Sequence, residues 1–334
     1  MNLRETWKHL EDDTRVTEGP RRLQRRILPA ARRDVFLGLE MPSKRRMLIL
    51  RVSEDTVDGQ PEIPDSRGLV VRMIRRVGEN NSVEVELILT DMARQDVFDL
   101  LVHDLIAAAE EPQEERTGLT RFLARLSDWQ HLFRRMVPRR LSREEQRGLW
   151  GELWVLREIL APPADFNTAL NGWRGPMGAD QDFQIGDTCI EVKTSTAATF
   201  DRVSISSERQ LEAPAGIALL LLGLSLDGRP GHGETLPELV ESARAASSES
   251  GFQHLLDPRL QLRGYLTEDA GHYSDLGYSV RSIHPFRIEK GFPRIVSGDL
   301  QAGIGEVRYT LSTAACGRYQ LTFERPAELL EGLV

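Results

Sequence analysis

Three polar residues of one short segment have side chains suited to phosphodiester hydrolysis. The segment Asp180–Ser195, DQDFQIGDTCIEVKTS, contains Asp182, Glu191 and Lys193. Two carboxylates can hold a hard divalent ion such as Mg²⁺ through oxygen ligands, and a lysine adds a second positive charge. A metal ion neutralises the nonbridging oxygens of a phosphate and lowers the pKa of a bound water, while a nearby cation stabilises the charged transition state.

The spacing of these residues predicts a two-stranded hairpin that brings them onto one face. Gly186 followed by Asp187 suits a type II′ turn, whose first central residue has a positive φ. The turn sets three opposed pairs: Ile185 with Thr188, Phe183 with Ile190, and Asp182 with Glu191. Alternation then gives an apolar face (Phe183, Ile185, Ile190, Val192) and a polar face (Asp182, Gln184, Glu191, Lys193). Carboxylates opposed at about 4.5–5.5 Å between Cβ atoms repel, so this pair needs a cation.

Another interpretation of the same segment is an ordinary surface hairpin, because an isolated Glu-x-Lys is common in proteins. Three features favour the site instead: the aspartate in register, the apolar opposite face, and the small polar residues Thr194 and Ser195 that follow.

The segment resembles the PD-(D/E)XK nuclease superfamily. Asp182 matches the aspartate of that motif and Glu191-Val192-Lys193 its (D/E)-x-K, whereas Gln181 stands where the motif has proline. The runs GLWGELWVLREIL, NGWRGPMGADQDFQIGDTCIEVKTS and VSISSERQLE are similar to a bacterial group of that superfamily found among restriction and phage-defence gene sets. The resemblance implies an α+β fold with a restriction-endonuclease-like core, a mixed sheet flanked by helices in the order αβββαβ.

Two further residues join the candidate site through this resemblance. Glu152 matches a helix-borne acid that joins the metal site in many members, and Gln210 matches a glutamine that follows the Glu-x-Lys strand. Glu152 lies within the apolar stripe of its predicted helix, where a buried acid needs a partner; the alternative is a glutamate at the stripe's edge that reaches solvent. Gln210 has the alternative of a capping box, in which it bonds the backbone N–H of Ser207. Gly148 and Gly151 would allow the helix to pack closely.

Patterns along the chain predict three regions. Alternating apolar residues in MLILRV, LVVRMI and VEVELIL predict a small antiparallel sheet, which three helices follow. Ser142 and Glu145 form a capping-box signature at the start of the third helix. The regions are an N-terminal sheet and helical region (1–138), a nuclease core (139–230) and a C-terminal α/β extension that packs on the core (231–334). Within the extension, 251–275 is expected to be rich in loops.

Composition excludes several classes of protein. The chain has 334 residues, 40% of them hydrophobic and 28% charged, which is ordinary for a folded domain. Its two cysteines, Cys189 and Cys316, show no metal-ligand spacing and cannot form a disulfide framework, so a reducing compartment is expected. The longest apolar stretch, Gly216 to Leu226, is shorter than the roughly 20 residues of a membrane helix. A cytoplasmic protein without membrane contact is therefore expected.

Charge is unevenly distributed along the chain. The net charge of −8 argues against indiscriminate coating of nucleic acid. Two basic runs, 21–46 and 134–147, could still contact phosphates; their candidate residues are Arg25, Arg26, Arg45, Arg46, Arg139 and Arg140. Arginines on solvated loops or helix faces are the alternative for each run.

Together these features predict a Mg²⁺-dependent DNA endonuclease. Its expected metal ligands are Asp182, Glu191 and Glu152, and Mn²⁺ should be able to replace Mg²⁺. The expected substrate is double-stranded DNA. Since the sequence contains no recognisable ATPase, helicase or methylase motif, we expect subunits of a restriction or anti-phage system to supply these activities; the oligomeric state is open. Two other functions stay open: a noncatalytic DNA-binding or assembly subunit with a nuclease-like fold, and a nuclease for RNA or branched DNA.

Overall fold

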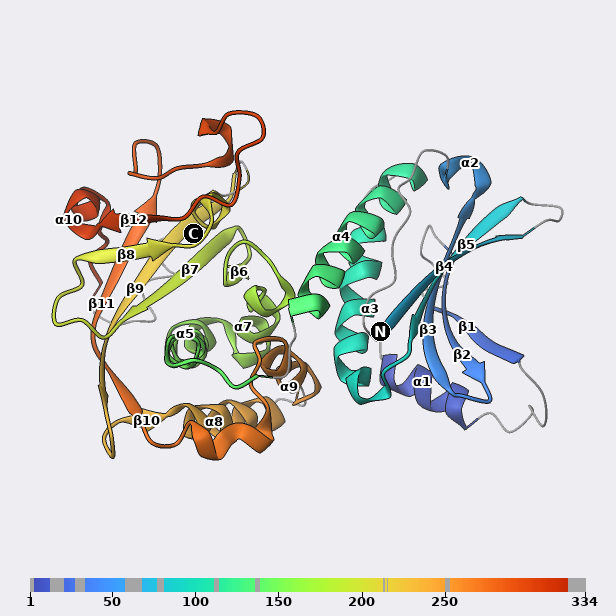
Figure 1. Ribbon diagram of the computed structural model, residues 1–334, viewed down its shortest axis with the longest axis horizontal. Helices are drawn as coiled ribbons and strands as arrows, with labels where there is room; N and C mark the ends of the chain where they lie inside the picture. Colours follow the sequence, from blue (N-terminus) through green and yellow to red (C-terminus); the bar gives the residue numbers. More distant parts are fainter. Residues whose placement is uncertain are drawn as a thin grey trace. The chain divides into compact units, whose positions relative to one another are not determined.

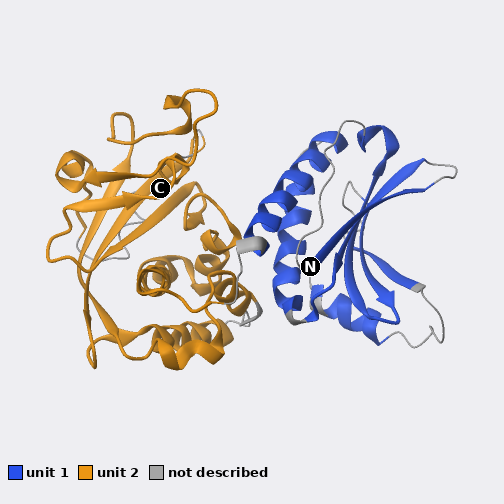
Figure 2. Ribbon diagram, in the orientation of Figure 1, with its two compact units in different colours: residues 1–137 blue, residues 138–334 orange. Residues whose placement is uncertain are grey.

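The chain folds into two compact units, Met1–Val137 and Pro138–Val334 (Figure 2). The computed structural model describes residues 3–12, 21–27, 34–57, 68–76, 81–110, 114–135, 139–212, 214, 216–249 and 253–323. The predicted core and the predicted C-terminal extension both lie in the second unit.

The described part of the first unit contains a five-stranded antiparallel sheet. Its strands are β1 (Arg21–Ile27), β2 (Asp34–Met41), β3 (Arg45–Ser53), β4 (Leu69–Arg76) and β5 (Ser82–Leu89), in the order β1-β2-β3-β5-β4 (Figure 1). Strands β3, β4 and β5 confirm the predicted antiparallel sheet. Strands β1 and β2 lie within the basic run 21–46, so the arginines of these strands lie on neither loops nor helix faces. β2 pairs on both of its edges and is buried along most of its length, which fixes it as a strand.

Helices lie on one side of this sheet (Figure 1). They are α1 (Leu3–Glu11), α2 (Glu54–Val57), α3 (Gln95–Glu110) and α4 (Glu115–Arg135), with a short 3-10 helix η1 (Met92–Arg94). Trp7 of α1 is fully buried beside Phe98 of α3, with ring centroids 6.4 Å apart, and donates a hydrogen bond to Asp99. The opposite side of the sheet carries a small apolar cluster: Phe36, Met47, Ile49 and Ile88.

A mixed sheet runs through the second unit, in the order β10-β11-β9-β7-β6. Its strands are β6 (Phe183–Ile185), β7 (Thr188–Ser195), β9 (Ala218–Arg229), β10 (Glu234–Thr235) and β11 (Gly277–Ile288); β8 (Arg202–Ile205) and β12 (Tyr309–Ser312) pair with each other. β7 and β9 are parallel, whereas the other neighbours in the sheet are antiparallel. The chain is therefore an α+β protein with a mixed sheet in its second unit, as the resemblance implies.

Helices border this sheet (Figure 1). The longer ones are α5 (Arg143–Val155), which continues as the π-helix η2 (Leu156–Leu160), α7 (Phe166–Gly172), α8 (Leu236–Glu249) and α9 (Gln253–Leu262). The short ones are α6 (Ala161–Ala164), η3 (Gly175–Met177), η4 (Glu208–Leu211), η5 (Thr267–His272), η6 (Ser297–Asp299), α10 (Thr313–Cys316) and η7 (Gly317–Tyr319). Ser142 and Glu145 form the predicted capping box at the start of α5. The expectation of a loop-rich 251–275 is wrong in part, because α9 occupies its first half.

None of the helices within the described ranges is both long and apolar enough to cross a membrane.

Candidate active site

The hairpin that carries the candidate residues has the predicted register. Ile185 pairs with Thr188 and Phe183 pairs with Ile190, and Gly186 in the turn has a φ of 54°. The side chains of Phe183 and Ile190, on the predicted apolar face, are fully buried in the core next to α5. The tight turn thus sets which side chains point away from that core.

Asp182 lies one residue before β6, so the pairing of strands stops short of the predicted Asp182–Glu191 pair. Its Oδ2 instead accepts a hydrogen bond of 2.8 Å from the backbone N–H of Val192, so that the side chain reaches β7. The backbone N–H groups of Arg174 and Gly175 donate to the Asp182 carbonyl oxygen at 2.8 and 2.9 Å. A Cβ at Gly175 would lie 2.9 Å from Asp182 Oδ1, which explains the glycine.

Glu191 is the most enclosed acid of the hairpin, with 2% of its surface exposed. Its Oε1 lies 2.8 Å from Nζ of Lys193, whereas its buried Oε2 has no hydrogen-bond partner among the described residues. Burial raises the pKa of Glu191 well above its ordinary value, and the negative charge of Asp182 raises it further, against the opposing effect of Lys193. The unpaired oxygen is a donor that a cation could bind.

Gln210, on η4, contacts the site directly. Its Oε1 accepts hydrogen bonds from Lys193 Nζ at 3.0 Å and from the backbone N–H of Ser206 at 2.8 Å. Ser207 caps η4 through its hydroxyl, which accepts from the N–H of Arg209. The alternative in which Gln210 bonds the N–H of Ser207 is therefore wrong, and Lys193 is held between two oxygen acceptors.

Glu152 is 4% exposed, so the alternative of a solvated glutamate is wrong. Its Oε2 accepts a hydrogen bond of 2.8 Å from the indole Nε1 of Trp173, and its Oε1 pairs with the guanidinium of Arg263. Burial raises the pKa of Glu152 to about 7, with Arg263 opposing that shift and the charge of Asp182 adding to it. The three acids thus influence one another electrostatically.

Arg263 and Trp173 complete the site and were not among the predicted residues. Trp173 is fully buried and stacks on Phe183 with ring centroids 6.5 Å apart, as expected for core packing, but it also orients Glu152. Arg263 follows α9, in the segment expected to be rich in loops. A signal existed: Leu256, Arg259, Leu260 and Arg263 have helical spacing, so two arginines share an apolar stripe.

Of the three predicted metal ligands, Asp182 and Glu191 could hold a divalent ion. Among the described residues, no group of three or more His, Cys, Asp or Glu side chains is arranged to hold a metal ion. Trp173 and Arg263 engage both oxygens of Glu152, so its role as a third metal ligand stays a prediction. The unpaired oxygen of Glu191 and the nearby carboxylate of Asp182 are the oxygen donors that a hard divalent ion prefers.

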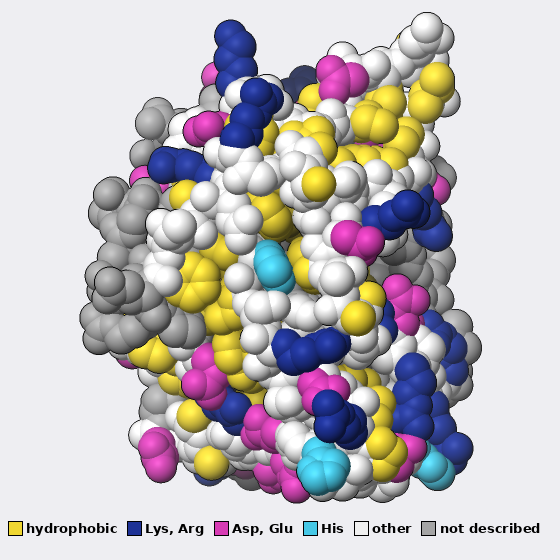
Figure 3. Space-filling model, turned by 90° about the vertical axis from the view of Figure 1, so that its left-hand side faces the viewer, with side chains coloured by type: hydrophobic (Ala, Val, Ile, Leu, Met, Phe, Trp, Pro, Cys, Tyr) yellow, Lys and Arg dark blue, Asp and Glu magenta, His cyan; other side chains and the backbone are white. Residues whose placement is uncertain are grey.

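The arginines predicted to contact nucleic acid lie beside partners. Arg46 is enclosed between Glu11 and Asp99 and lies 5.2 Å from the ring of Trp7, so it acts within the fold. The others lie at the surface with these neighbours: Arg25 with His9, Arg26 with Asp34, Arg45 with Glu40, Arg139 with Glu145, and Arg140 with Asp269. On the face of the second unit drawn in Figure 3, basic and acidic side chains are interspersed, and the described residues form no continuous basic surface there. Phosphate contacts by these arginines stay a prediction.

The fold and the site together define a nuclease-like protein of the PD-(D/E)XK class. Helix α5, which carries the buried Glu152, precedes the hairpin. Trp173 pairs with Phe183 in an isolated antiparallel β-bridge, and β9, which is parallel to β7, follows the hairpin. The family described as "Putative PD-(D/E)XK family member, (DUF4420)" matches residues 3–314, and the chain belongs to this family. No curated protein and no solved structure matches the chain.

Proposed function

We propose that this protein is a metal-dependent endonuclease that hydrolyses DNA. One observation carries the proposal: Glu191 Oε2 is buried without a hydrogen-bond partner among the described residues, beside Asp182 and Lys193. A buried carboxylate oxygen without a partner is unfavourable, and a bound cation would remove that cost. Membership of a PD-(D/E)XK family supports the same function.

Asp182 and Glu191 would hold the ion, for which Mg²⁺ is the first choice and Mn²⁺ a substitute. The ion would supply charge neutralisation at the scissile phosphate and a lower pKa for the attacking water. In the balanced step, the water oxygen adds to phosphorus as the bond from phosphorus to the sugar oxygen breaks. The water gives up one proton, and the leaving oxygen takes one up.

Lys193 would stabilise the charge that develops on the phosphate. Glu191 Oε1 and Gln210 Oε1 accept hydrogen bonds from two of the three N–H groups of its ammonium. The third N–H can therefore donate to a water or a phosphate oxygen. Gln210 is a positioning residue in this scheme, since it acts through Lys193. Trp173 and Arg263 hold Glu152 at the border of the site, where the guanidinium of Arg263 offsets its charge.

Double-stranded DNA is the proposed substrate, and partner subunits with ATPase, helicase or methylase activity are the proposed partners. The similarity of three runs of this sequence to proteins of restriction and phage-defence gene sets supports both. Cleavage assays on duplex, branched and single-stranded DNA and on RNA, with the same protein, would choose among the substrates.

The test is nicking of supercoiled plasmid by the full chain with Mg²⁺. Asp182→Asn, Glu191→Gln and Lys193→Ala should each lower the rate by about 100-fold or more, because each removes a charge that acts on the transition state. Asp187→Asn is the matched control, since Asp187 is exposed at the turn of the same hairpin. Undiminished nicking by all three variants would contradict the proposal.

A noncatalytic nucleic-acid-binding subunit is the second candidate. It is favoured by the absence, within the described residues, of a cluster of three acids for a metal. Addition of Mn²⁺ separates the two candidates: a ligand at 100 times its Kd stabilises the folded state by about 2.7 kcal/mol. The wild-type protein should show the corresponding rise in Tm and Glu191→Gln should not; equal responses of both proteins would favour the noncatalytic role.

A further inference from the structure

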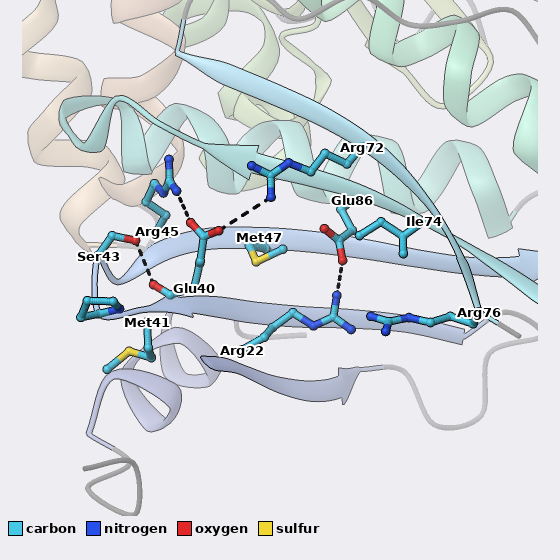
Figure 4. A pocket seen from close by; sticks show the side chains of 11 residues that line it. Arg22, Glu40, Met41, Ser43, Arg45, Met47, Arg72, Ile74, Arg76 and Glu86 are labelled. Atoms are coloured by element: carbon cyan, nitrogen blue, oxygen red, sulfur yellow. Dashed lines mark hydrogen bonds and ion pairs between the residues drawn. The ribbon is translucent and has the colours of Figure 1, made fainter. Parts of the chain in front are cut away.

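The sheet of the first unit carries an open cavity of about 530 Å³ on the side away from its helices (Figure 4). Arg22 of β1 reaches across to Glu84 of β5, with 2.9 Å between Nη2 and Oε2. Three strand spacings of about 4.8 Å each separate these strands in a flat sheet, so the contact requires the sheet to curl. The cavity lies within this curl, and the turn at Pro42 and Ser43 forms part of its border.

The charges around the cavity are unequal in number. Five arginines and three glutamates form the cluster among the described residues of this face: Arg22, Arg45, Arg51, Arg72 and Arg76 with Glu40, Glu84 and Glu86. The cluster therefore has two more positive than negative charges. The carboxylate of Glu84 accepts hydrogen bonds from Arg22, Arg51 and Arg76. The guanidiniums of Arg72 and Arg76 are the most accessible, since about half of each side chain is exposed (49% and 48%).

The charge that lines the cavity changes from positive at the edge of the sheet to negative nearer its middle. Arg72 and Arg76 come from the edge strand β4, whereas Glu86 is 2% exposed on β5, nearer the middle of the sheet. Met47 and Ile74 supply apolar surface between them (Figure 4). An anion would be bound at the edge, and a flat group with N–H donors would be bound deeper, against apolar side chains and a carboxylate.

A nucleotide has this distribution of charge. Its phosphate matches the guanidinium fork, and its base offers an apolar face and amino groups for a carboxylate. The volume falls in the range of about 300–1,000 Å³ that small-molecule sites occupy, which suits one nucleotide rather than a base-paired duplex. An acidic peptide fits less well, because Glu40 and Glu86 line the same cavity and would repel its carboxylates.

We propose that this cavity binds one unstacked nucleotide of a nucleic-acid strand, with the phosphate on Arg72 and Arg76 and the base against Met47 and Ile74. The choice of a nucleic-acid strand over other phosphate compounds rests on the proposed function, and in a duplex substrate the bound nucleotide would have to leave the base stack. The site itself is separate from Asp182 and Glu191. Protein–nucleic acid contacts of this kind combine a phosphate clamp with a surface that receives the base.

The experiment measures binding of a fluorescently labelled single-stranded 20-mer to the full chain by anisotropy, with EDTA present so that no cleavage occurs. Arg72→Ala should weaken binding about tenfold and reduce the slope of log affinity against log salt by about 0.7, the value for one phosphate on a single strand. Arg75→Ala is the matched control: Arg75 lies on the same strand, outside the cavity lining, with 74% of its side chain exposed. It should bind as the wild-type protein does.

A second variant tests the site for the base without removing a charge. Ile74→Trp fills the cavity, so it should weaken binding while the salt slope stays unchanged. Because EDTA is present, this binding does not depend on the proposed metal, so a failure of binding and a failure of cleavage are distinguishable. Equal effects of Arg72→Ala and Arg75→Ala, an absence of binding by the wild-type chain, or displacement of the strand by polyglutamate as effectively as by unlabelled strand would overturn the proposal.

Discussion

Glu84 and Glu86 lie two residues apart on β5 and face the same arginines, yet their pKa values shift in opposite directions. Burial raises the pKa of Glu84, but hydrogen bonds from Arg51, Arg22 and Arg76 outweigh it and hold the pKa at about 2. For Glu86, burial also raises the pKa and the charge of Glu84 adds to this, so that the attraction of Arg22 does not prevail. The number of arginine donors decides the direction.

Glu84→Gln should therefore destabilise the protein in a pH-dependent way. Because the folded pKa of about 2 lies below the ordinary 4.5, the unfolded chain binds more protons between these values, and stability is lost as the pH falls through them. The wild-type protein should be more stable than the variant by about 3 kcal/mol at pH 7, and the difference should shrink toward pH 2. Denaturant unfolding at several pH values measures this.

Glu86→Gln is the control, because its effect on stability should depend on pH in the opposite direction. Since the folded pKa of Glu86 is raised, the folded chain binds more protons, and the contribution of this acid to stability falls as the pH rises through the shifted range. A Glu84→Gln penalty that does not change with pH would show that the lost stability comes from packing and not from ionisation.

The sequence predicts the acids and the lysine of the candidate site, but not the residues that surround them in the fold. Asp182, Glu191 and Lys193 are readable because a tight turn fixes their spacing, and Glu152 because an acid interrupts an apolar stripe. For Arg263 the sequence shows only an arginine within an apolar stripe, because its partner Glu152 lies 111 residues away in the chain and only the tertiary fold brings them together. The position of Asp182 was also unreadable, because a hydrogen bond to Val192 replaces the expected strand pairing.

At the scale of elements, contact between α5 and β7 depends on one glycine. A Cβ at Gly151 would lie 2.3 Å from Cγ2 of Thr194, whereas a Cβ at Gly148 would meet no atom within 4 Å. The expectation of close packing is therefore confirmed for Gly151 and wrong for Gly148. Gly151 sets the distance between Glu152 on the helix and Lys193 on the strand.

The two glycines should respond in opposite ways to alanine. Gly151→Ala should cost about 1–3 kcal/mol through overpacking and should also lower nicking activity, since α5 must move away from β7. Gly148→Ala should stabilise the protein by up to about 1 kcal/mol, because it adds a better helix former where space is free. Thermal unfolding and nicking of the two variants, measured side by side, provide the check; a neutral Gly151→Ala would mean that Thr194 can give way.

Most elements can be predicted from their periodicity, and the exceptions have physical causes. On β1 the alternation of apolar residues is weak because arginines occupy positions on both faces, including Arg22, Arg25 and Arg26. On α9 the proline at 258 argues against a helix, since it lacks the N–H that a helix interior requires. Both elements form because tertiary contacts supply what the local pattern lacks: salt bridges across the curled sheet for β1, and burial of Leu256 and Leu260 for α9.

At the scale of the whole molecule, the sheet of the second unit combines strands from the segment before residue 230 with a strand from the segment after it. β11 pairs with β9 from Gly277 opposite Arg229 to Ile288 opposite Leu219, and so covers the edge that β7 leaves open. The segment after β9 also supplies α8, which packs on α5, and Arg263, which pairs with Glu152. The nuclease-like part of the sequence therefore needs the residues that follow it.

A fragment of residues 139–230 should accordingly fail to fold by itself. Without β11, the strand β9 would present an unpaired edge whose leucines, from Leu219 to Leu222, are buried in the full chain, and such edges promote aggregation. A fragment of residues 138–334 retains the whole sheet and should unfold in one cooperative thermal transition. Size-exclusion chromatography and circular dichroism of the two fragments decide; a monomeric, cooperatively melting 139–230 would show that the C-terminal third is a separate domain resting on a core that is already complete.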